Sequence, residues 1–200
     1  MGGARRARRA RATWAGVLLV PALWSCAGSP LVPDDGGFRN PRHGYWLGVP
    51  PAGDPPWEPE EVEGSLLAFR RHGEIRMTFS SRCGVPLPRP EFLARHLRIG
   101  ITANVVRESG PVELGALTGW QQVFDANAEH GAVRVKTVTF TANGCALDWV
   151  LIGREAGGFE EAERDFDAWW GTLAVQAQSG AAEATASGES AGESAPEETP

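Results

Sequence analysis

Ala132–Arg154 reads AVRVKTVTFTANGCALDWVLIGR and carries the clearest strand pattern in the chain. Apolar and polar residues alternate in its first half, Ala132–Ala142, with the two-residue period of a β-strand. Asn143-Gly144 follows, a dipeptide that tight hairpin turns favour because both central positions need a positive φ. The second half, Cys145–Arg154, is apolar on both faces, which predicts a central strand with a packed layer on each side.

The segments around this hairpin predict further strands and two helices. Strands are expected at 45–49, 65–71, 74–80, 103–107 and 119–126, and helices at 90–99 and 158–174. The apolar face of the first helix would be Phe92, Leu93, His96 and Leu97, and that of the second Phe159, Ala162, Phe166, Trp169, Trp170 and Leu173. We therefore predict an α+β domain in which an antiparallel sheet of about six strands is flanked by helices.

Three segments match the strand order and aromatic pattern of a known fold. They are GYWLGVP at 44–50 followed by Trp57, the two-sided strand at 145–152, and Phe159 followed by FDAWW at 166–170. On these residues, the region 38–175 resembles the Mog1/PsbP-like fold, which several bacterial lipoproteins use. The resemblance implies an adaptor or accessory module, because that fold has no shared catalytic residues.

The N-terminus has the pattern of a bacterial export signal. Five arginines within 5–11 precede an apolar stretch over 12–23, which is too short to span a bilayer but fits a secretory signal. Leu23-Trp24-Ser25-Cys26 then resembles the lipobox of bacterial lipoproteins, in which the Cys is acylated and becomes the first residue. We therefore expect a lipoprotein signal peptide over 1–25 and lipidation of Cys26. The alternatives are an ordinary signal cut within 27–29 and an uncleaved N-terminal anchor.

Charge and the residue after Cys26 indicate where such a protein would reside and what it would bind. Ala27 stands where Asp favours inner-membrane retention in enteric lipoproteins, so the resemblance implies the outer membrane, facing the periplasm. Loss of the five N-terminal arginines would lower the formal net charge from -6 to -11, and no concentrated basic surface is apparent, which excludes nucleic acid as a partner. The expected partners are the membrane, through the lipid, and envelope proteins or a small ligand.

The chain divides into segments of different composition. Residues 26–37 are predicted to be a flexible tether, 38–177 a single domain, and 178–200 a disordered acidic tail without large apolar residues. If Cys26 is acylated, Cys83 and Cys145 remain, and in an oxidising compartment an even number predicts a disulfide. Two buried free thiols are the alternative. A metal site is disfavoured, because two Cys this far apart lack ligand spacing.

Few residues suggest catalysis. Residues 188–192 read GESAG, but they lie in the low-complexity tail without the strand and helix that a nucleophile elbow needs. His43, His72 and His130 each precede a Gly, which favours turns over convergence on a metal. His96 is expected as a partly buried residue of its helix. No cofactor-binding motif is present, so no cofactor is expected.

Two kinds of residue remain as candidates for a site. Asp148 interrupts an apolar strand, and we expect it to pair with Arg134 or Arg76 or to point past the sheet edge, since a buried carboxylate needs a partner. As a functional group it would be a perturbed acid in a cleft. Trp57 and Trp120 lie near predicted loops and are candidates for an exposed binding surface, with packing in the core as the alternative.

These features favour a lipid-anchored envelope protein that acts as a non-enzymatic binding, accessory or scaffold module. The alternative is a periplasmic hydrolase or metal-dependent enzyme that uses the loop histidines and Asp148. A third possibility is a structural spacer without a concave surface.

Overall fold

A computed structural model describes residues 31–71, 74–99, 101, 105–128, 131–154 and 158–176. The predicted signal peptide, Cys26, the acidic tail with its GESAG motif, His72 and His130 all lie outside these residues. Among the described helices, none has the length and apolar character that a membrane crossing requires.

The main sheet has seven antiparallel strands in the order β4-β5-β6-β10-β9-β8-β7. Their bounds are β4 Glu58–Pro59, β5 Leu67–Arg71, β6 Ile75–Cys83, β10 Cys145–Gly153, β9 Gly131–Ala142, β8 Leu117–Ala128 and β7 Val105–Leu114. The predicted β9–β10 hairpin is confirmed, with Cys145 opposite Ala142 across the turn. As expected for a strand that is apolar on both sides, β10 lies in the middle of the sheet, between β6 and β9.

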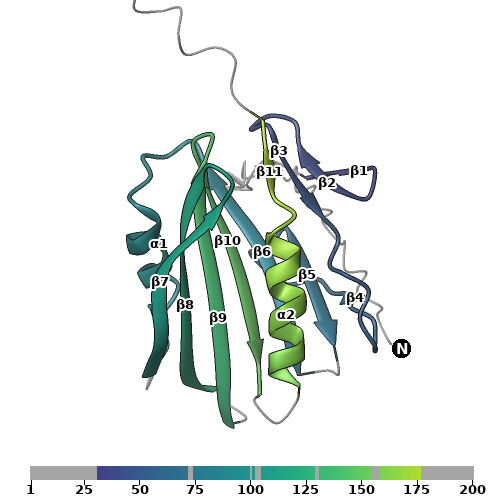
Figure 1. Cartoon of the computed structure of the whole chain (residues 1–200), viewed down its shortest axis with the longest axis vertical. Helices are drawn as coiled ribbons and strands as arrows, with labels where there is room; N and C mark the ends of the chain where they lie inside the picture. Colours follow the sequence, from purple (N-terminus) through teal and green to yellow (C-terminus); the bar gives the residue numbers. More distant parts are fainter. Residues whose placement is uncertain are drawn as a thin grey trace, which may run out of the picture.

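A smaller sheet of four strands packs beside the main one in the order β1-β2-β3-β11. Its strands are β1 Val32–Asp34, β2 Gly37–Asn40, β3 Tyr45–Gly48 and β11 Ala174–Val175. The predicted tether is therefore wrong over its last residues, because Val32–Asp34 pairs with Gly37–Arg39 in a hairpin. The described start and end of the chain lie in this same sheet, β1 at one edge and β11 at the other (Figure 1).

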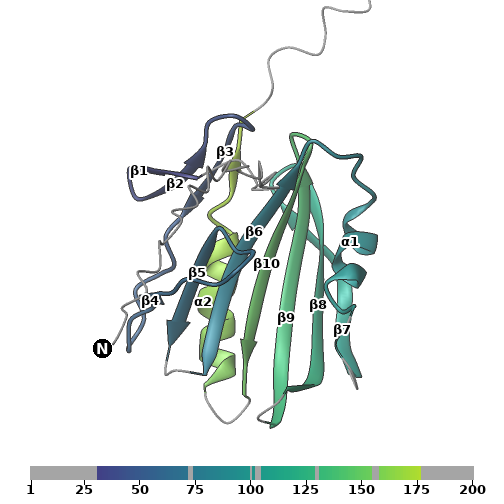
Figure 2. The same cartoon turned by 180° about the vertical axis from the view of Figure 1, so that it is seen from behind.

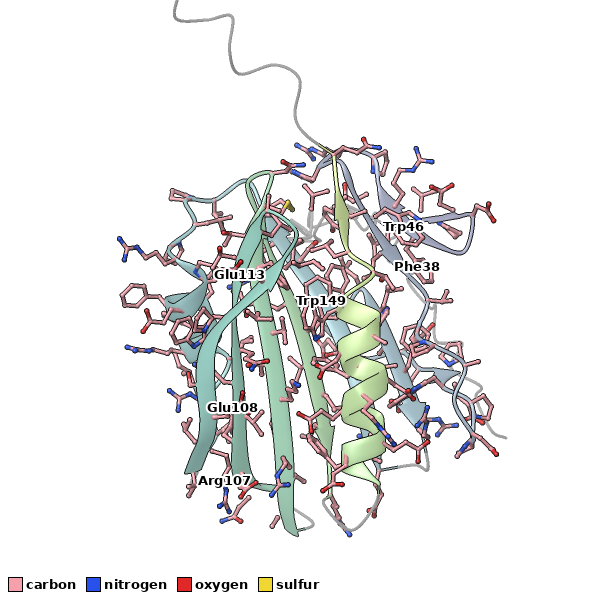
Figure 3. The ribbon with its side chains drawn as sticks, in the orientation of Figure 1. Phe38, Trp46, Arg107, Glu108, Glu113 and Trp149 are labelled. Carbon is pink, nitrogen blue, oxygen red and sulfur yellow. A yellow bond between two sulfur atoms is a disulfide. The ribbon has the colours of Figure 1, made fainter. Side chains whose placement is uncertain are left out.

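The two helices cover opposite faces of the main sheet (Figures 1 and 2). Helix α2, Phe159–Trp170, lies on what we call the front face, where Phe159, Phe166 and Trp169 are fully buried. Trp149 of β10 packs beneath it in the same core (Figure 3). Helix α1, Pro90–His96, covers the opposite, back face over β8, β9 and β10. The α+β architecture predicted from the sequence is confirmed.

Three local predictions about this architecture need correction. The apolar face of α1 is formed by Leu93 and Ala94, whereas His96 is exposed and Phe92 is 47% exposed. Strand β7 continues seven residues beyond the predicted end at Arg107, and it turns directly into β8. Helix α1 also ends at His96, before the predicted end at Ile99.

Candidate functional sites

A disulfide joins Cys83 and Cys145 at one end of the main sheet, as the sequence predicted. Cys83 ends β6, Cys145 begins β10, and the two residues lie directly opposite each other in the strand register. Cys145 is fully buried and Cys83 is half-buried. The bond therefore fastens the sheet at the end that faces the smaller sheet.

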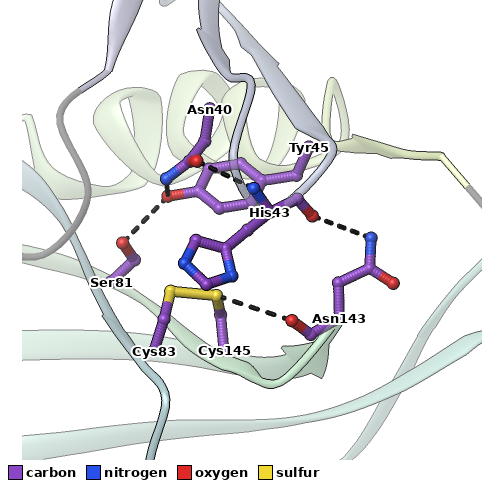
Figure 4. Close-up of a disulfide and its surroundings, with 7 residues drawn as sticks. All are labelled: Asn40, His43, Tyr45, Ser81, Cys83, Asn143 and Cys145. Carbon is purple, nitrogen blue, oxygen red and sulfur yellow. Dashed lines mark hydrogen bonds between the residues drawn. A yellow bond between two sulfur atoms is a disulfide. The ribbon is translucent and has the colours of Figure 1, made fainter. Parts of the chain in front are cut away.

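The imidazole of His43 lies against this disulfide (Figure 4). His43 belongs to the loop between β2 and β3, and its backbone N–H donates to Oδ1 of Asn40 at 3.0 Å. Nδ2 of Asn143, in the β9–β10 turn, donates to the His43 carbonyl at 2.8 Å and to the Gln176 carbonyl at 3.0 Å. One ligand atom from each of His43, Cys83 and Cys145 lies within 4.8 Å of the other two. Asn143-Gly144, predicted only as a turn, thus also holds the His43 loop in place.

A short chain of buried polar groups runs beside the disulfide. The Tyr45 hydroxyl donates to Oγ of Ser81 at 2.8 Å and accepts from Nδ2 of Asn40 at 3.1 Å. Burial raises the pKa of Tyr45, although both hydrogen bonds act in the opposite direction. Because each polar atom in this chain has a partner, the chain serves to hold β2 and β3 against β6.

Asp148 points to the back face, and its partners differ from the predicted ones. Its Oδ1 accepts from the Thr139 hydroxyl at 2.7 Å, and its Oδ2 lies 3.8 Å from the Arg82 guanidinium. The prediction of Arg134 was wrong because Arg134 lies opposite Gly153, on the front face. Arg76 was also wrong, because it lies opposite Ile152, four residues from Asp148, and binds elsewhere.

Burial raises the pKa of Asp148, against the opposing effects of the Thr139 hydrogen bond and the Arg82 charge. The carboxylate is 2% exposed. His43 lies on the front side, beside Cys145, whereas Asp148 is three residues along the same strand and therefore projects from the other face. The structure does not bring these two groups of the proposed enzyme together.

Two buried cations under α2 were not anticipated. Lys136 is 5% exposed, and its Nζ donates to Glu163 and to Asp167, each at 2.9 Å. Burial disfavours the Lys136 ammonium, but the hydrogen bonds with Asp167 and Glu163 more than offset this and raise its pKa. Two signals in the sequence could have predicted this pairing. Glu163 and Asp167 are spaced i, i+4 and so lie on one face of the helix, and the alternation of the strand places Lys136 on its buried face.

The second buried cation, Arg71, packs against the ring of Trp57. The Arg71 guanidinium lies 4.3 Å from the centre of the Trp57 ring and pairs with Asp165 of α2. Nε1 of Trp57 donates to the same Asp165 carboxylate at 3.0 Å. Arg71 is 3% exposed, so the cluster is internal and the indole packs rather than presents a recognition surface.

Trp120 lies elsewhere, on the back face of β8 next to the sheet edge. Its Nε1 donates to Oγ of Ser109 on β7 at 2.9 Å, and its side chain is half-buried. The two tryptophans proposed as a binding surface therefore occupy different faces and do not form one patch. Trp120 remains the candidate of the pair, because it borders β7, which no further strand covers within the described part of the chain.

A groove of about 330 Å³ opens on the front face between α2 and the outer strands. Its lining contains two cations and two acids around one apolar residue: Arg107, Arg134, Glu108, Glu163 and Val123. Asp125 beneath it accepts hydrogen bonds from both arginines, which lower its pKa. Figure 3 shows Arg107 and Glu108 on β7 at this side of the sheet.

The groove borders an open sheet edge. Strand β7 is the last strand of the main sheet, and most of its side chains are exposed on both faces. Pro111 near its middle and a register shift between Val106 and Glu108 are features that natural edge strands use against uncontrolled pairing. The β7 edge is thus accessible to a partner, but Pro111 and the register shift limit its pairing with a further β-strand.

Comparisons with known proteins support the fold. No protein-family profile matches the sequence, and no curated protein is detectably similar to it in sequence. The solution structure of cyanobacterial PsbP (CyanoP) from Synechocystis aligns with a TM-score of 0.53 at 13% identity, covering 77% of this chain and 99% of that one. LpqN, described as involved in cell envelope biogenesis of Mycobacterium tuberculosis, aligns with a TM-score of 0.49 at 11% identity, covering 66% and 83%.

The likeness to CyanoP shows that the domain has a PsbP-like fold, as the resemblance of its aromatic segments implied. At 13% identity it shows the fold alone. The likeness to LpqN, with its lower TM-score, is too weak to carry an inference.

Proposed function

We propose that this chain is a lipid-anchored protein of the cell envelope whose domain is a non-enzymatic binding or accessory module. In this proposal Cys26 is the acylated residue, the membrane is the outer membrane, and the domain faces the periplasm. The lipobox-like sequence Leu23–Cys26 and the PsbP-like fold support the two parts of the proposal independently.

The observation that carries the binding role is the position of the chain start relative to the open edge of the main sheet. Residue 32 begins β1 in the smaller sheet, on the side of the molecule opposite β7 (Figures 1 and 2). Cys26 precedes Leu31 by five residues, which span at most about 18 Å when extended. A lipid there would hold the smaller sheet near the bilayer, and β7 with its groove would face away from it.

The groove suits recognition of a polar segment of another envelope protein. Its two cations and two acids offer charge-assisted hydrogen bonds to side chains of either sign. Val123, which is 8% exposed, provides a small apolar floor between them. The groove charges also have partners within the domain, since both arginines bind Asp125 and Glu163 binds Lys136. Unlike the buried Asp148, Lys136 and Arg71, however, they remain partly exposed.

The anchoring part is tested by intact-mass analysis of the protein extracted from membranes with detergent. We expect a chain that begins at residue 26 and carries diacylglycerol and an acyl chain, and a Cys26→Ser variant that lacks both and is not cleaved there. A soluble wild-type product that begins after residue 26 would exclude the anchor.

The binding part is tested by a photoreactive amino acid placed at one of two exposed positions in the anchored, full-length protein. Ser109 lies on the open edge strand β7, one residue after Glu108 of the groove, whereas Val32 of β1, 49% exposed, serves as the matched position near the membrane. We expect discrete protein adducts from position 109 and few from position 32. Equal adducts at both positions, or adducts only from position 32, would contradict β7 as the recognition edge.

A further inference from the structure

Three residues with metal-binding side chains converge at the disulfide end of the sheet. They come from three separate segments: His43 from the β2–β3 loop, Cys83 from the end of β6, and Cys145 from the start of β10 (Figure 4). Two sulfurs and one imidazole are a donor set that soft or borderline cations such as Zn²⁺ prefer. The sulfurs are unavailable as thiolates while the disulfide is closed.

The strand ladder would keep the two cysteines together if that bond were opened. Strands β6 and β10 are paired in continuous register from Cys145–Cys83 to Ile152–Arg76. Opposed residues of an antiparallel pair have Cβ atoms about 4.5–5.5 Å apart without any crosslink. The two thiols would therefore remain side by side on the front face.

The third donor, the His43 imidazole, is carried by a loop whose position does not depend on the disulfide. Hydrogen bonds to Asn40 and Asn143 fix the backbone of His43 on both sides. Gln176 of the chain end further donates its N–H to the Gly44 carbonyl at 2.8 Å. The loop that carries the imidazole is thus tied to the β9–β10 turn and to the segment after β11, not to the disulfide.

The spacing suits a tetrahedral cation. With Zn–S bonds of about 2.3 Å and Zn–N bonds of about 2.0–2.1 Å, two sulfur ligands lie about 3.8 Å apart and a sulfur and a nitrogen about 3.5 Å apart. The donor atoms of His43 and of the cysteines lie within 4.8 Å of one another. The imidazole therefore needs to approach by at most about 1.3 Å, and the two sulfurs must move apart to about 3.8 Å once their bond is broken. Cys83 and His43 are half-buried, which leaves a fourth position open to water.

We propose that Cys83, Cys145 and His43 form a redox-gated Zn²⁺ site, closed in the disulfide form and open in the dithiol form. A dithiol reductant supplies the two electrons: its thiolate attacks Sγ of the more accessible Cys83, and Cys145 leaves as a thiolate. The second thiol of the reductant then releases Cys83 and forms the reductant's own disulfide. Zn²⁺ binds the two thiolates and the neutral imidazole, and any remaining thiol proton passes to solvent.

The test uses the full chain with Cys26→Ser, so that Cys83 and Cys145 are its only thiols. The protein is reduced without oxygen, freed of reductant, and titrated with Co²⁺ and then Zn²⁺. We expect one Co²⁺ per chain with thiolate-to-metal charge-transfer absorption, displacement by Zn²⁺, and no such band in the disulfide form. His43→Ala should weaken binding by about 100-fold or more, since a direct ligand costs at least what an outer-shell partner does. His96→Ala, an exposed histidine of α1, is the matched control and should change nothing.

Three results would overturn the proposal. One is binding by the dithiol protein that is no tighter than binding by a Cys83→Ser/Cys145→Ser chain. Another is equal affinity with and without the His43 imidazole. The third is loss of the native circular dichroism on reduction, because the strand ladder is what keeps the two thiols together.

Discussion

Reduction of the Cys83–Cys145 disulfide is predicted to lower the free energy of unfolding by about 4 kcal/mol. The bond joins residues separated by 62 positions, and α1, β7, β8 and β9 all lie between them. The chain-entropy treatment of a crosslinked unfolded chain gives about 4 kcal/mol for a loop of this length at 25 °C. For a domain of this size each kcal/mol corresponds to about 2–4 °C, so the melting temperature should fall by about 8–16 °C.

This loss of stability should arise mainly from the greater conformational entropy of the reduced unfolded chain, because reduction leaves the other native contacts in place. Cys145 stays buried in the core whether or not it is bonded, and the β6–β10 ladder supplies the remaining pairing. Reduced protein should therefore keep its native near-ultraviolet circular dichroism at 25 °C and unfold cooperatively at the lower temperature.

Calorimetry or circular dichroism of the chain with and without a phosphine reductant measures the shift. A Cys83→Ala/Cys145→Ala variant is the control and should melt at one temperature in both conditions. Thiol labelling of the denatured protein should find both cysteines blocked until reductant is added. The reasoning is refuted if both cysteines are bonded and reduction changes the free energy of unfolding by less than about 1 kcal/mol.

Two further changes test the packing. Burial raises the pKa of Asp148, so its folded state binds the proton more tightly, and the associated stability is present below the unfolded pKa and lost as pH rises through the folded pKa. Asp148→Asn should therefore be more stable than wild type in denaturant titrations at pH 7, with an advantage that shrinks as the pH approaches the unfolded value of about 3.9; a constant difference would contradict this. A Cβ on Gly119 would lie 2.7 Å from the Thr139 carbonyl oxygen, and Gly119→Ala should cost about 1–3 kcal/mol. Gly110→Ala on the adjacent strand meets nothing within 4 Å and should be neutral in the same titration.

The parts of the fold that the sequence predicted well are those whose burial is regular. Strand β9, strand β10 and helix α2 were placed to within a few residues, because one face or both faces of each are buried throughout. The disulfide was predicted from the two cysteines that remain if Cys26 is acylated and from an oxidising compartment, and the structure adds that the two residues are opposed in the register.

The parts that were missed lie where burial is irregular. Strand β7 is exposed on both faces over its first five residues, it alternates between exposed and half-buried residues only in its second half, and Gly110-Pro111 inside it resembles a loop. The β1–β2 hairpin is short and half-exposed, and its glycines suggested a tether. The alternation of β9 places Lys136 on the core side, but its own strand does not identify its partners, which come from α2, 27 and 31 residues away.

Register also explains why the candidate sites are separate. Cys145 begins β10 opposite Ala142, whereas Gly153 ends it opposite Arg134, a residue of the groove. The disulfide end and the groove therefore lie at opposite ends of the same strands. His43→Ala removes the proposed metal ligand and does not alter β7. It should therefore leave the photocrosslinked adducts from position 109 unchanged. Loss of metal binding with intact adducts would separate the two proposals, whereas loss of both would show that the His43 loop supports the fold rather than a site.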